Sequence, residues 1–147
     1  MSDTLELVTQ HWGWTGLNPE RLIAENEFGN LIIKDTEGKF WRICPEEVSC
    51  EVIAENDAAY NELVKSEEFN DDWFMELLLV AAKKKFSAEL ADGEKYTLAL
   101  PEPFGGEYNA TNLRTVSLER IIQFSGDLGK EIKDLPDGVK VKVQSIV

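Results

Sequence analysis

Cysteine and histidine are scarce in this sequence. Its 147 residues include two cysteines, Cys44 and Cys50, and a single histidine, His11. Two cysteines are too few for a disulfide scaffold, and they show neither a C-x-x-C spacing nor His-rich surroundings that would indicate a zinc site. We therefore expect two reduced cysteines, no metal and no cofactor.

The sequence also lacks a long apolar run and a basic N-terminal segment. The longest strongly apolar stretch, residues 77–82, has six residues, whereas a membrane-spanning helix needs roughly 18 to 20. Residues 1–8 contain Asp3 and Glu6 and no basic residue, unlike a signal peptide. We expect a cytoplasmic protein with no membrane partner.

Basic residues are outnumbered: 15 Lys plus Arg stand against 28 Asp plus Glu, giving a net charge of −13. This charge repels a phosphate backbone, and the densest basic run, residues 83–85, is short, so direct nucleic-acid binding is not expected. Hydrophobic residues make up 43% and aromatic residues 10% of the chain. That is enough for a core, and we predict one folded domain over residues 1–147.

Alternating and turn patterns predict an antiparallel sheet of about five strands. Polar residues 35–38 separate two apolar runs and predict a β-hairpin, which a third strand follows to form a three-strand meander. The predicted strands are residues 30–34, 39–43, 50–54, 95–100 and 139–143. Residues 101–108, with two prolines and two adjacent glycines, predict a loop.

Capping residues and apolar spacing predict three to four helices packed against this sheet, and hence an α+β fold. They cover residues 18–27, 57–65, 73–86 and 118–135, the last capped by Ser117 and kinked or interrupted at residues 125–127. The stretch 73–86 is the most apolar, and we predict that it is the central helix on the sheet.

Motifs for catalysis and ligand binding are weak. His11 has no serine or cysteine in a nucleophile-elbow context, and Gly105-Gly106 is not followed by the Gly-Lys-Ser/Thr of a phosphate loop. The acidic segments 35–38 and 70–72 lack the ligand spacing of a calcium loop. An enzyme that acts on a small molecule through carboxylates and the Gly105-Gly106 loop remains an alternative hypothesis.

The most distinctive feature is a concentration of negative charge. Residues 46–72 contain ten acidic residues and one basic residue, Lys65, and so carry −9 of the total charge of −13. The acidic residues are Glu46, Glu47, Glu51, Glu55, Asp57, Glu62, Glu67, Glu68, Asp71 and Asp72. Such a run is either a solvated face that maintains solubility or a docking surface for a basic protein. A third hypothesis is an acidic DNA mimic that occupies a nuclease or repressor groove.

Four short runs carry a family resemblance. They are FGNLI (residues 28–32), FWRICPE (40–46), NLRTVSLE (112–119) and FSGD (124–127). Over about residues 10–145 the chain resembles the domain that forms the C-terminal part of Tdi-type immunity proteins of bacterial type VI secretion. The resemblance implies a non-enzymatic cytoplasmic protein that binds and neutralises a cognate toxin, in the best-known cases a DNase, and so protects the producing cell or its kin.

The resemblance marks no binding residue, so the acidic segment of residues 46–72 is our own candidate for the partner-binding site. Its charge predicts a basic toxin as the partner, with loop 101–108 as an additional contact.

Overall fold

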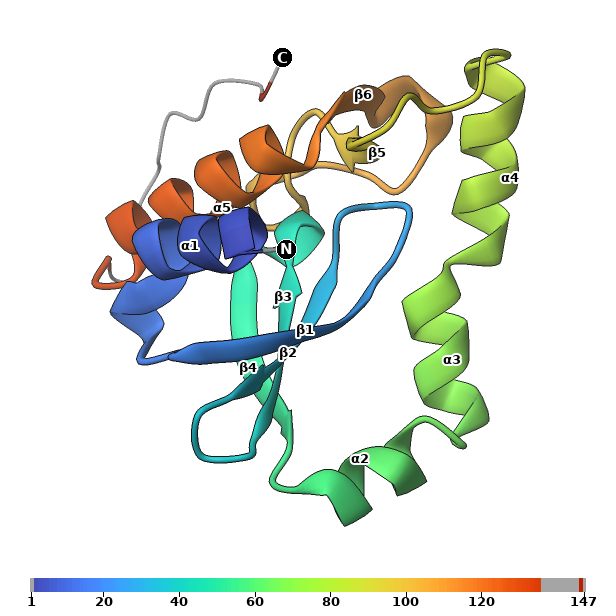
Figure 1. Cartoon of the computed structure of the whole chain (residues 1–147). Helices are drawn as coiled ribbons and strands as arrows, with labels where there is room; N and C mark the ends of the chain where they lie inside the picture. Colours follow the sequence, from blue (N-terminus) through green and yellow to red (C-terminus); the bar gives the residue numbers. More distant parts are fainter. Residues whose placement is uncertain (1, 136–145, 147) are drawn as a thin grey trace.

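The computed structural model describes residues 2–135 and residue 146 and has the predicted α+β fold (Figure 1). An antiparallel sheet with strand order β1-β2-β3-β4 and a second antiparallel pair, β5-β6, together hold the strands of this part of the chain. The strands are β1 (Pro19–Glu25), β2 (Leu31–Asp35), β3 (Phe40–Cys44), β4 (Ser49–Ala54), β5 (Glu94–Leu98) and β6 (Leu113–Ser117). The helices are α1 (Ser2–Trp12), α2 (Asp57–Leu63), α3 (Glu67–Phe74), α4 (Glu76–Lys85) and α5 (Leu118–Ile132).

The segment 18–27, predicted as a helix, is instead the first strand of the larger sheet. In β1, Leu22 lies opposite Ile33 of β2, and Ala24 lies opposite Ile32. The prediction was wrong because Pro19 fits the first residue of a strand as well as the first turn of a helix. The predicted meander β2-β3-β4 is confirmed, and β1 adds a fourth strand to it.

The turn of the β2-β3 hairpin is held by one carboxylate. Asp35 Oδ1 accepts hydrogen bonds from the backbone N–H groups of Glu37 and Lys39 at 2.8 and 2.9 Å, and Oδ2 accepts one from Trp41 Nε1 at 2.8 Å. Burial raises the pKa of Asp35, but these hydrogen bonds prevail and leave the pKa below its ordinary value. This acidic segment is therefore a structural turn.

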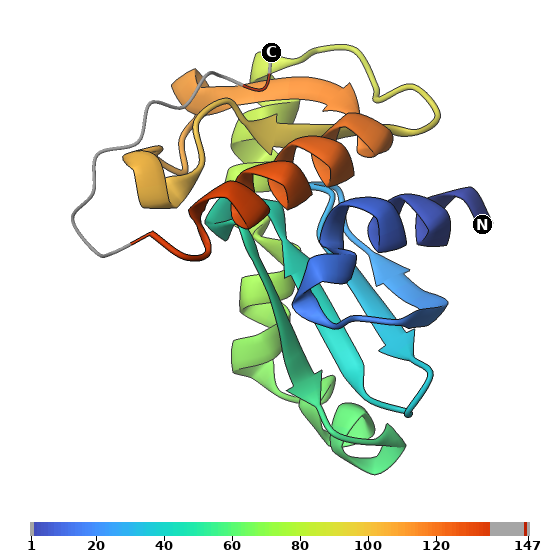
Figure 2. The same ribbon diagram turned by 90° about the vertical axis from the view of Figure 1, so that its left-hand side faces the viewer.

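Helices α1 and α5 cover one face of the larger sheet, and α5 lies between the two sheets (Figure 2). Helix α1 was not predicted; its Val8 and Trp12 are buried in one cluster with Ile122 of α5. The predicted interruption of the helix at residues 125–127 is wrong, because α5 runs unbroken through Gly126. A Cβ atom at Gly126 would lie 2.4 Å from the carbonyl oxygen of His11, so glycine at this position permits the close approach of α1.

Helices α2 and α3 cover the opposite face. Side chains alternate along a strand, so Ile32 faces away from its neighbours Leu31 and Ile33, which join the α1–α5 cluster. The second cluster consists of Ile32, Phe40, Ala54 and Trp73, with Tyr60 and Phe69 packed against it. Helix α4 extends this arc of helices and packs on β5-β6 through Leu78 and Ala82 (Figure 1).

The apolar stretch 73–86 is therefore not one central helix on the sheet. Helix α3 ends at Phe74 and α4 begins at Glu76, and between them Met75 adopts the left-handed backbone conformation with φ of 46°. The prediction was wrong because the apolar residues of this stretch surround the helix, and α4 buries only one side of it. Leu77, on another side, is 89% exposed.

Strand β5 is confirmed, whereas its partner β6 was not predicted. The loop 101–108 contains one short 3₁₀ turn (Glu102–Phe104). A Cβ atom at Gly106 would lie 1.7 Å from the carbonyl oxygen of Leu100, so the chain itself requires this glycine. The predicted strand over residues 139–143 lies outside the described residues.

The contact between α1 and α5 predicts an unusual effect of a glycine-to-alanine substitution. Alanine normally stabilises a helix interior by about 1 kcal/mol relative to glycine. We expect Gly126→Ala instead to lower the free energy of unfolding by about 1 to 3 kcal/mol, because the new methyl group displaces α1. Urea unfolding measures this effect. Gln123→Ala, at an exposed position of the same helix, should change stability by no more than about 0.5 kcal/mol; a stabilised Gly126→Ala variant would contradict the packing.

Candidate partner-binding surface

Nine of the ten acidic residues of the predicted site are exposed. Glu46 is the exception, at 3% exposure. The exposed residues are distributed over several elements: Glu47 on the 3₁₀ turn Pro45–Glu47, Glu51 on β4, Glu55 after it, Asp57 and Glu62 on α2, and Glu67, Glu68, Asp71 and Asp72 on α3. The candidate surface thus begins beside β4 and follows the outer helices (Figure 1).

Ion pairs neutralise only part of this surface. The pairs are Asp57–Lys34 at 3.0 Å, Glu62–Lys65 at 3.3 Å, Glu55–Lys39 at 4.0 Å and Asp72–Arg42. Within residues 2–135, no Lys or Arg comes within 4.0 Å of the carboxylates of Glu47, Glu51, Glu67, Glu68 and Asp71. Three of these five lie on α3, which makes α3 the least compensated part of the segment.

Arg42 on β3 joins the sheet to α3. Its guanidinium donates to the Asp72 carboxylate and, from Nε and Nη2, to Asn30 Oδ1 at 3.1 and 2.9 Å. The guanidinium carbon also lies 5.3 Å from the centroid of the Trp73 ring, in a cation–π arrangement. Asp72 is therefore tied to the sheet and has a structural role in addition to any contact with a partner.

Glu46 belongs to the same network but lies inside the protein. Asn30 Nδ2 donates to both of its carboxylate oxygens, at 2.8 and 2.9 Å. Burial raises the pKa of Glu46 to about 7, against the opposing effects of the hydrogen bonds from its own backbone N–H and Asn30 and of the charge of Arg42. The side chain thus fixes the 3₁₀ turn against the β1–β2 loop.

The two free cysteines are buried or half-buried. Burial, together with the negative charge of Glu46, raises the pKa of Cys44, whose Sγ lies 3.5 Å from a carboxylate oxygen of Glu47. Burial raises the pKa of Cys50 to about 12. Because the thiolate is the nucleophilic form, neither cysteine has the microenvironment of a reactive thiol.

The break between α3 and α4 is held from the sheet side. Asn26, which is 8% exposed, donates from Nδ2 to the carbonyl oxygen of Trp73 at 2.9 Å. In a continuous helix that carbonyl would accept from the N–H of Leu77, four residues later. No side chain caps the start of α4. Asn26 therefore occupies the acceptor that a straight helix would use, and Met75 supplies the change of direction.

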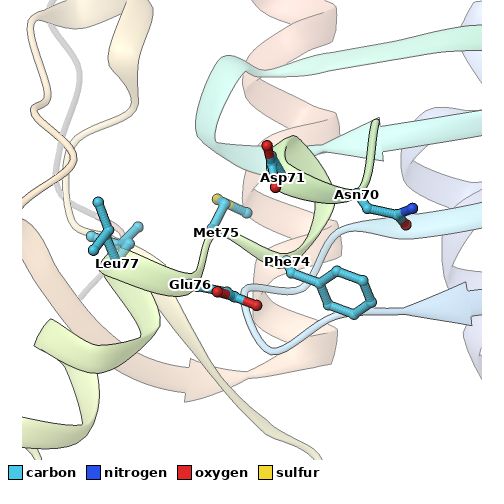
Figure 3. Close-up of a pocket in the computed structure, with 7 residues that line it drawn as sticks. Asn70, Asp71, Phe74, Met75, Glu76 and Leu77 are labelled. Carbon is cyan, nitrogen blue, oxygen red and sulfur yellow. The ribbon is translucent and has the colours of Figure 1, made fainter. Parts of the chain in front are cut away.

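Two adjoining hollows flank this break. The larger, of about 650 Å³, is lined by Asn70, Asp71, Phe74, Met75, Glu76, Leu77 and Leu78 (Figure 3). The smaller, of about 230 Å³, is lined by Arg42, Cys44, Glu46, Glu47, Asp71, Asp72, Met75, Leu78 and Tyr108. Asp71, Met75 and Leu78 belong to both. The structure thus brings Glu47 and the end of α3 together with Tyr108 of the loop, whereas the acidic residues of β4 and α2 line neither hollow.

Sequence reasoning missed the apolar part of this surface. Phe74 is 54%, Leu77 89% and Val80 52% exposed, although all three lie in the stretch that was predicted to pack on the sheet. In Figure 3, Phe74 and Leu77 extend to opposite sides of the break, with Glu76 between them. The sequence signal was the width of the apolar face, which exceeds what one packing contact buries.

The single histidine, considered from the sequence as a catalytic residue, has a structural contact. His11 Nδ1 lies 2.8 Å from Asp127 Oδ1 and links α1 to α5. Among the described residues, no group of three or more His, Cys, Asp or Glu side chains is arranged to hold a metal ion. In the same part of the chain, no helix has the length and apolar character needed to cross a membrane.

Residues 54–129, more than half of the chain, match the family model described as "T6SS immunity protein Tdi1, C-terminal". The matched segment begins at the last residue of β4 and includes α2, α3, α4, both strands of the small sheet and most of α5. It is shorter than the expected span of residues 10–145, and it contains the runs 112–119 and 124–127 but not 28–32 or 40–46. The curated proteins searched contain no match.

The break at Met75 predicts a reversed order of stability for two substitutions. Glycine adopts a left-handed backbone conformation readily, whereas alanine in that conformation costs about 1 kcal/mol or more. We expect Met75→Gly to be more stable than Met75→Ala by about 1 kcal/mol in urea unfolding. At Val80, inside α4, alanine should be the more stable of the same pair of substitutions. If alanine were the more stable substitution at Met75 as well as at Val80, α3 and α4 would form one helix.

Burial of Glu46 predicts a defined pH dependence of stability. Its pKa of about 7 exceeds the value of about 4.3 expected in the unfolded chain, so the folded state binds more protons between these pH values. The contribution of Glu46 to stability should therefore fall as the pH rises through this window. Glu46→Gln removes the effect, and its stability relative to wild type should increase by up to about 3 kcal/mol between pH 4 and pH 8.

Chemical unfolding at a series of pH values measures this difference. Glu47→Gln makes the same change at the exposed neighbouring residue and should largely retain the wild-type pH profile. Parallel profiles for wild type and Glu46→Gln would contradict a buried, protonatable Glu46.

Proposed function

Because the chain belongs to the family of the C-terminal part of the type VI secretion immunity protein Tdi1, we propose that it binds a cognate toxin and neutralises it. Neutralisation by binding requires an exposed surface with a chemistry that the toxin complements, and it requires no catalytic centre. Three carboxylates of α3 (Glu67, Glu68 and Asp71) have no Lys or Arg within 4.0 Å among the described residues, and this observation, on a helix within the family match, carries the proposal.

The acidic segment, residues 46–72, is the proposed contact surface. Glu67, Glu68 and Asp71 supply exposed negative charge that no basic side chain within 4.0 Å offsets among the described residues. A field of this kind accelerates association with a basic protein and disfavours acidic ones. Glu46 and Asp72 support the surface through their bonds to Asn30 and Arg42. Glu47, Glu51, Glu55, Asp57 and Glu62 extend it.

A nuclease is the toxin class that fits this surface best. Proteins that act on nucleic acids present basic residues to the phosphate backbone, and the acidic segment complements such residues. We propose the cytoplasm as the place of action, since there the protein meets a toxin that attacks DNA.

Charge reversal tests the proposal. The probe is the purified protein encoded by the adjacent upstream gene, tested as the candidate toxin, and stopped-flow or biolayer measurements give the association rate. We expect the triple variant Glu67→Lys, Glu68→Lys, Asp71→Lys to associate about tenfold or more slowly than wild type. Asp72 is left unchanged because its bond to Arg42 positions α3. The wild-type rate should also fall with added salt.

The matched control reverses three exposed acidic residues outside the segment, Glu20, Glu89 and Glu131. It makes the same change in net charge and should slow association much less. Equal slowing in both variants would indicate that overall charge, rather than α3, governs binding, and no complex with wild type would refute the immunity function for this toxin.

A further inference from the structure

The break between α3 and α4 leaves three large apolar side chains in water within seven residues. Phe74, Leu77 and Val80 account for half of the large hydrophobic side chains that are exposed in the described part of the chain. Single exposed apolar residues are ordinary, but several large ones close together in the chain and beside polar residues favour an interaction surface.

The exposure follows from the direction of the break. On α4, Leu78 and Ala82 are buried against the small sheet, so the remaining sides of the helix, with Leu77 and Val80, face outwards. On α3, Trp73 is buried against the larger sheet, and Phe74 next to it is exposed. The two helices are thus committed to two different sheets, and the Asn26–Trp73 hydrogen bond fixes the junction between them.

The apolar group borders a hollow that carries negative charge. Asp71 and Glu76 line the larger hollow together with Phe74 and Leu77 (Figure 3). Neither carboxylate has a Lys or Arg within 4.0 Å among the residues that the structure describes. The volume of this larger hollow, about 650 Å³, exceeds that of any single amino-acid side chain. The hollow therefore combines space, apolar walls and uncompensated carboxylates.

The sign of the charge differs between the two ends of this surface. The carboxylates of α3 lie on one side of the break, and Lys83, Lys84 and Lys85 lie at the far end of α4. Lys85 donates to the backbone carbonyls of Ala110 and Leu113, which fixes its position. A bound segment with basic residues would be attracted at the α3 end and repelled at the far end of α4, so its orientation is determined.

We propose that the break at Met75 is the anchoring point for the toxin: the larger hollow receives a large apolar side chain of the toxin that is flanked by Lys or Arg. Phe74 and Leu77 contact the apolar side chain, and Asp71 and Glu76 bind the flanking cations. The inference rests on the proposed function and names the residues that hold the complex together. Buried apolar contacts at the centre of an interface contribute most of its affinity, whereas the acidic rim mainly increases the association rate.

Charge favours this occupant over two others. In a symmetric dimer formed through this hollow, the Asp71 and Glu76 carboxylates of one copy would approach those of the other, which is unfavourable. An anionic lipid surface would be repelled by the same groups. A basic segment with an apolar residue complements both parts of the hollow.

Substitutions in the apolar group test the inference on the full chain, with the same purified toxin as the probe. We expect Leu77→Ser and Phe74→Ser each to weaken binding about 30-fold or more, mainly through faster dissociation and with little change in salt dependence. Leu77→Met keeps an apolar side chain of similar size and should bind within about threefold of wild type. Leu135→Ser, at an apolar residue that is 42% exposed elsewhere, should bind like wild type.

The outcomes separate this inference from the proposed function. Circular dichroism and thermal unfolding verify that each variant is folded. Wild-type affinity in folded Leu77→Ser and Phe74→Ser variants overturns the anchoring point and leaves toxin binding intact. Self-association of wild type that Leu77→Ser abolishes, with toxin affinity unchanged, assigns the hollow to a second copy and overturns the inference. No complex with wild type overturns both proposals.

Discussion

The loop between β1 and β2 holds the outer helices in place through two buried asparagines. Asn26 accepts hydrogen bonds from the backbone N–H groups of Phe28 and Asn30 at 2.9 and 3.0 Å and donates to the carbonyl of Trp73. Asn30 connects Glu46 to Arg42, and Arg42 binds Asp72. Buried polar groups that lose their partners cost about 1 to 3 kcal/mol each. The loop therefore determines where α3 ends and how its acidic residues face solvent.

This dependence crosses the boundary of the family match. The matched segment starts at residue 54, so it contains α3 and α4 but none of Asn26, Asn30 and Arg42. The outer helices carry most of the surface, while the β1–β2 loop and strand β3 carry the groups that position it. The two parts have different roles. The helices expose charged and apolar side chains to a partner under the proposed function, and the supporting groups hold the helices in place because their buried polar atoms are hydrogen-bonded.

Local patterns predicted the elements that local physics determines. Ser117 accepts a hydrogen bond from the N–H of Arg120 at 3.1 Å and starts α5 as its sequence context indicated. Strands β2, β3 and β4 follow from their apolar and β-branched residues and the turn at Asp35. The role of Pro19 could not be predicted, because the partner strand, and not the local sequence, decides between strand and helix. The close packing of α1 on the helix Leu118–Ile132 depends likewise on a distant contact, that of Gly126 with the backbone of His11.

The candidate surface was predictable only in its charge. Nothing local marks Met75 as a break, since methionine favours helices, and the hydrogen bond from Asn26 that fixes the break comes from 47 residues earlier. Sequence also cannot distinguish Glu46, enclosed by Asn30, from the exposed Glu47 beside it.

The exposed leucine of α4 has a consequence for the free protein. Leu77 is exposed to solvent in the free protein. An exposed apolar side chain of this size ordinarily promotes self-association at high protein concentration. Asp71 and Glu76 beside it repel the same patch on another copy. The carboxylates that would attract a basic toxin under the proposed function thus also disfavour self-association of the free protein through this patch.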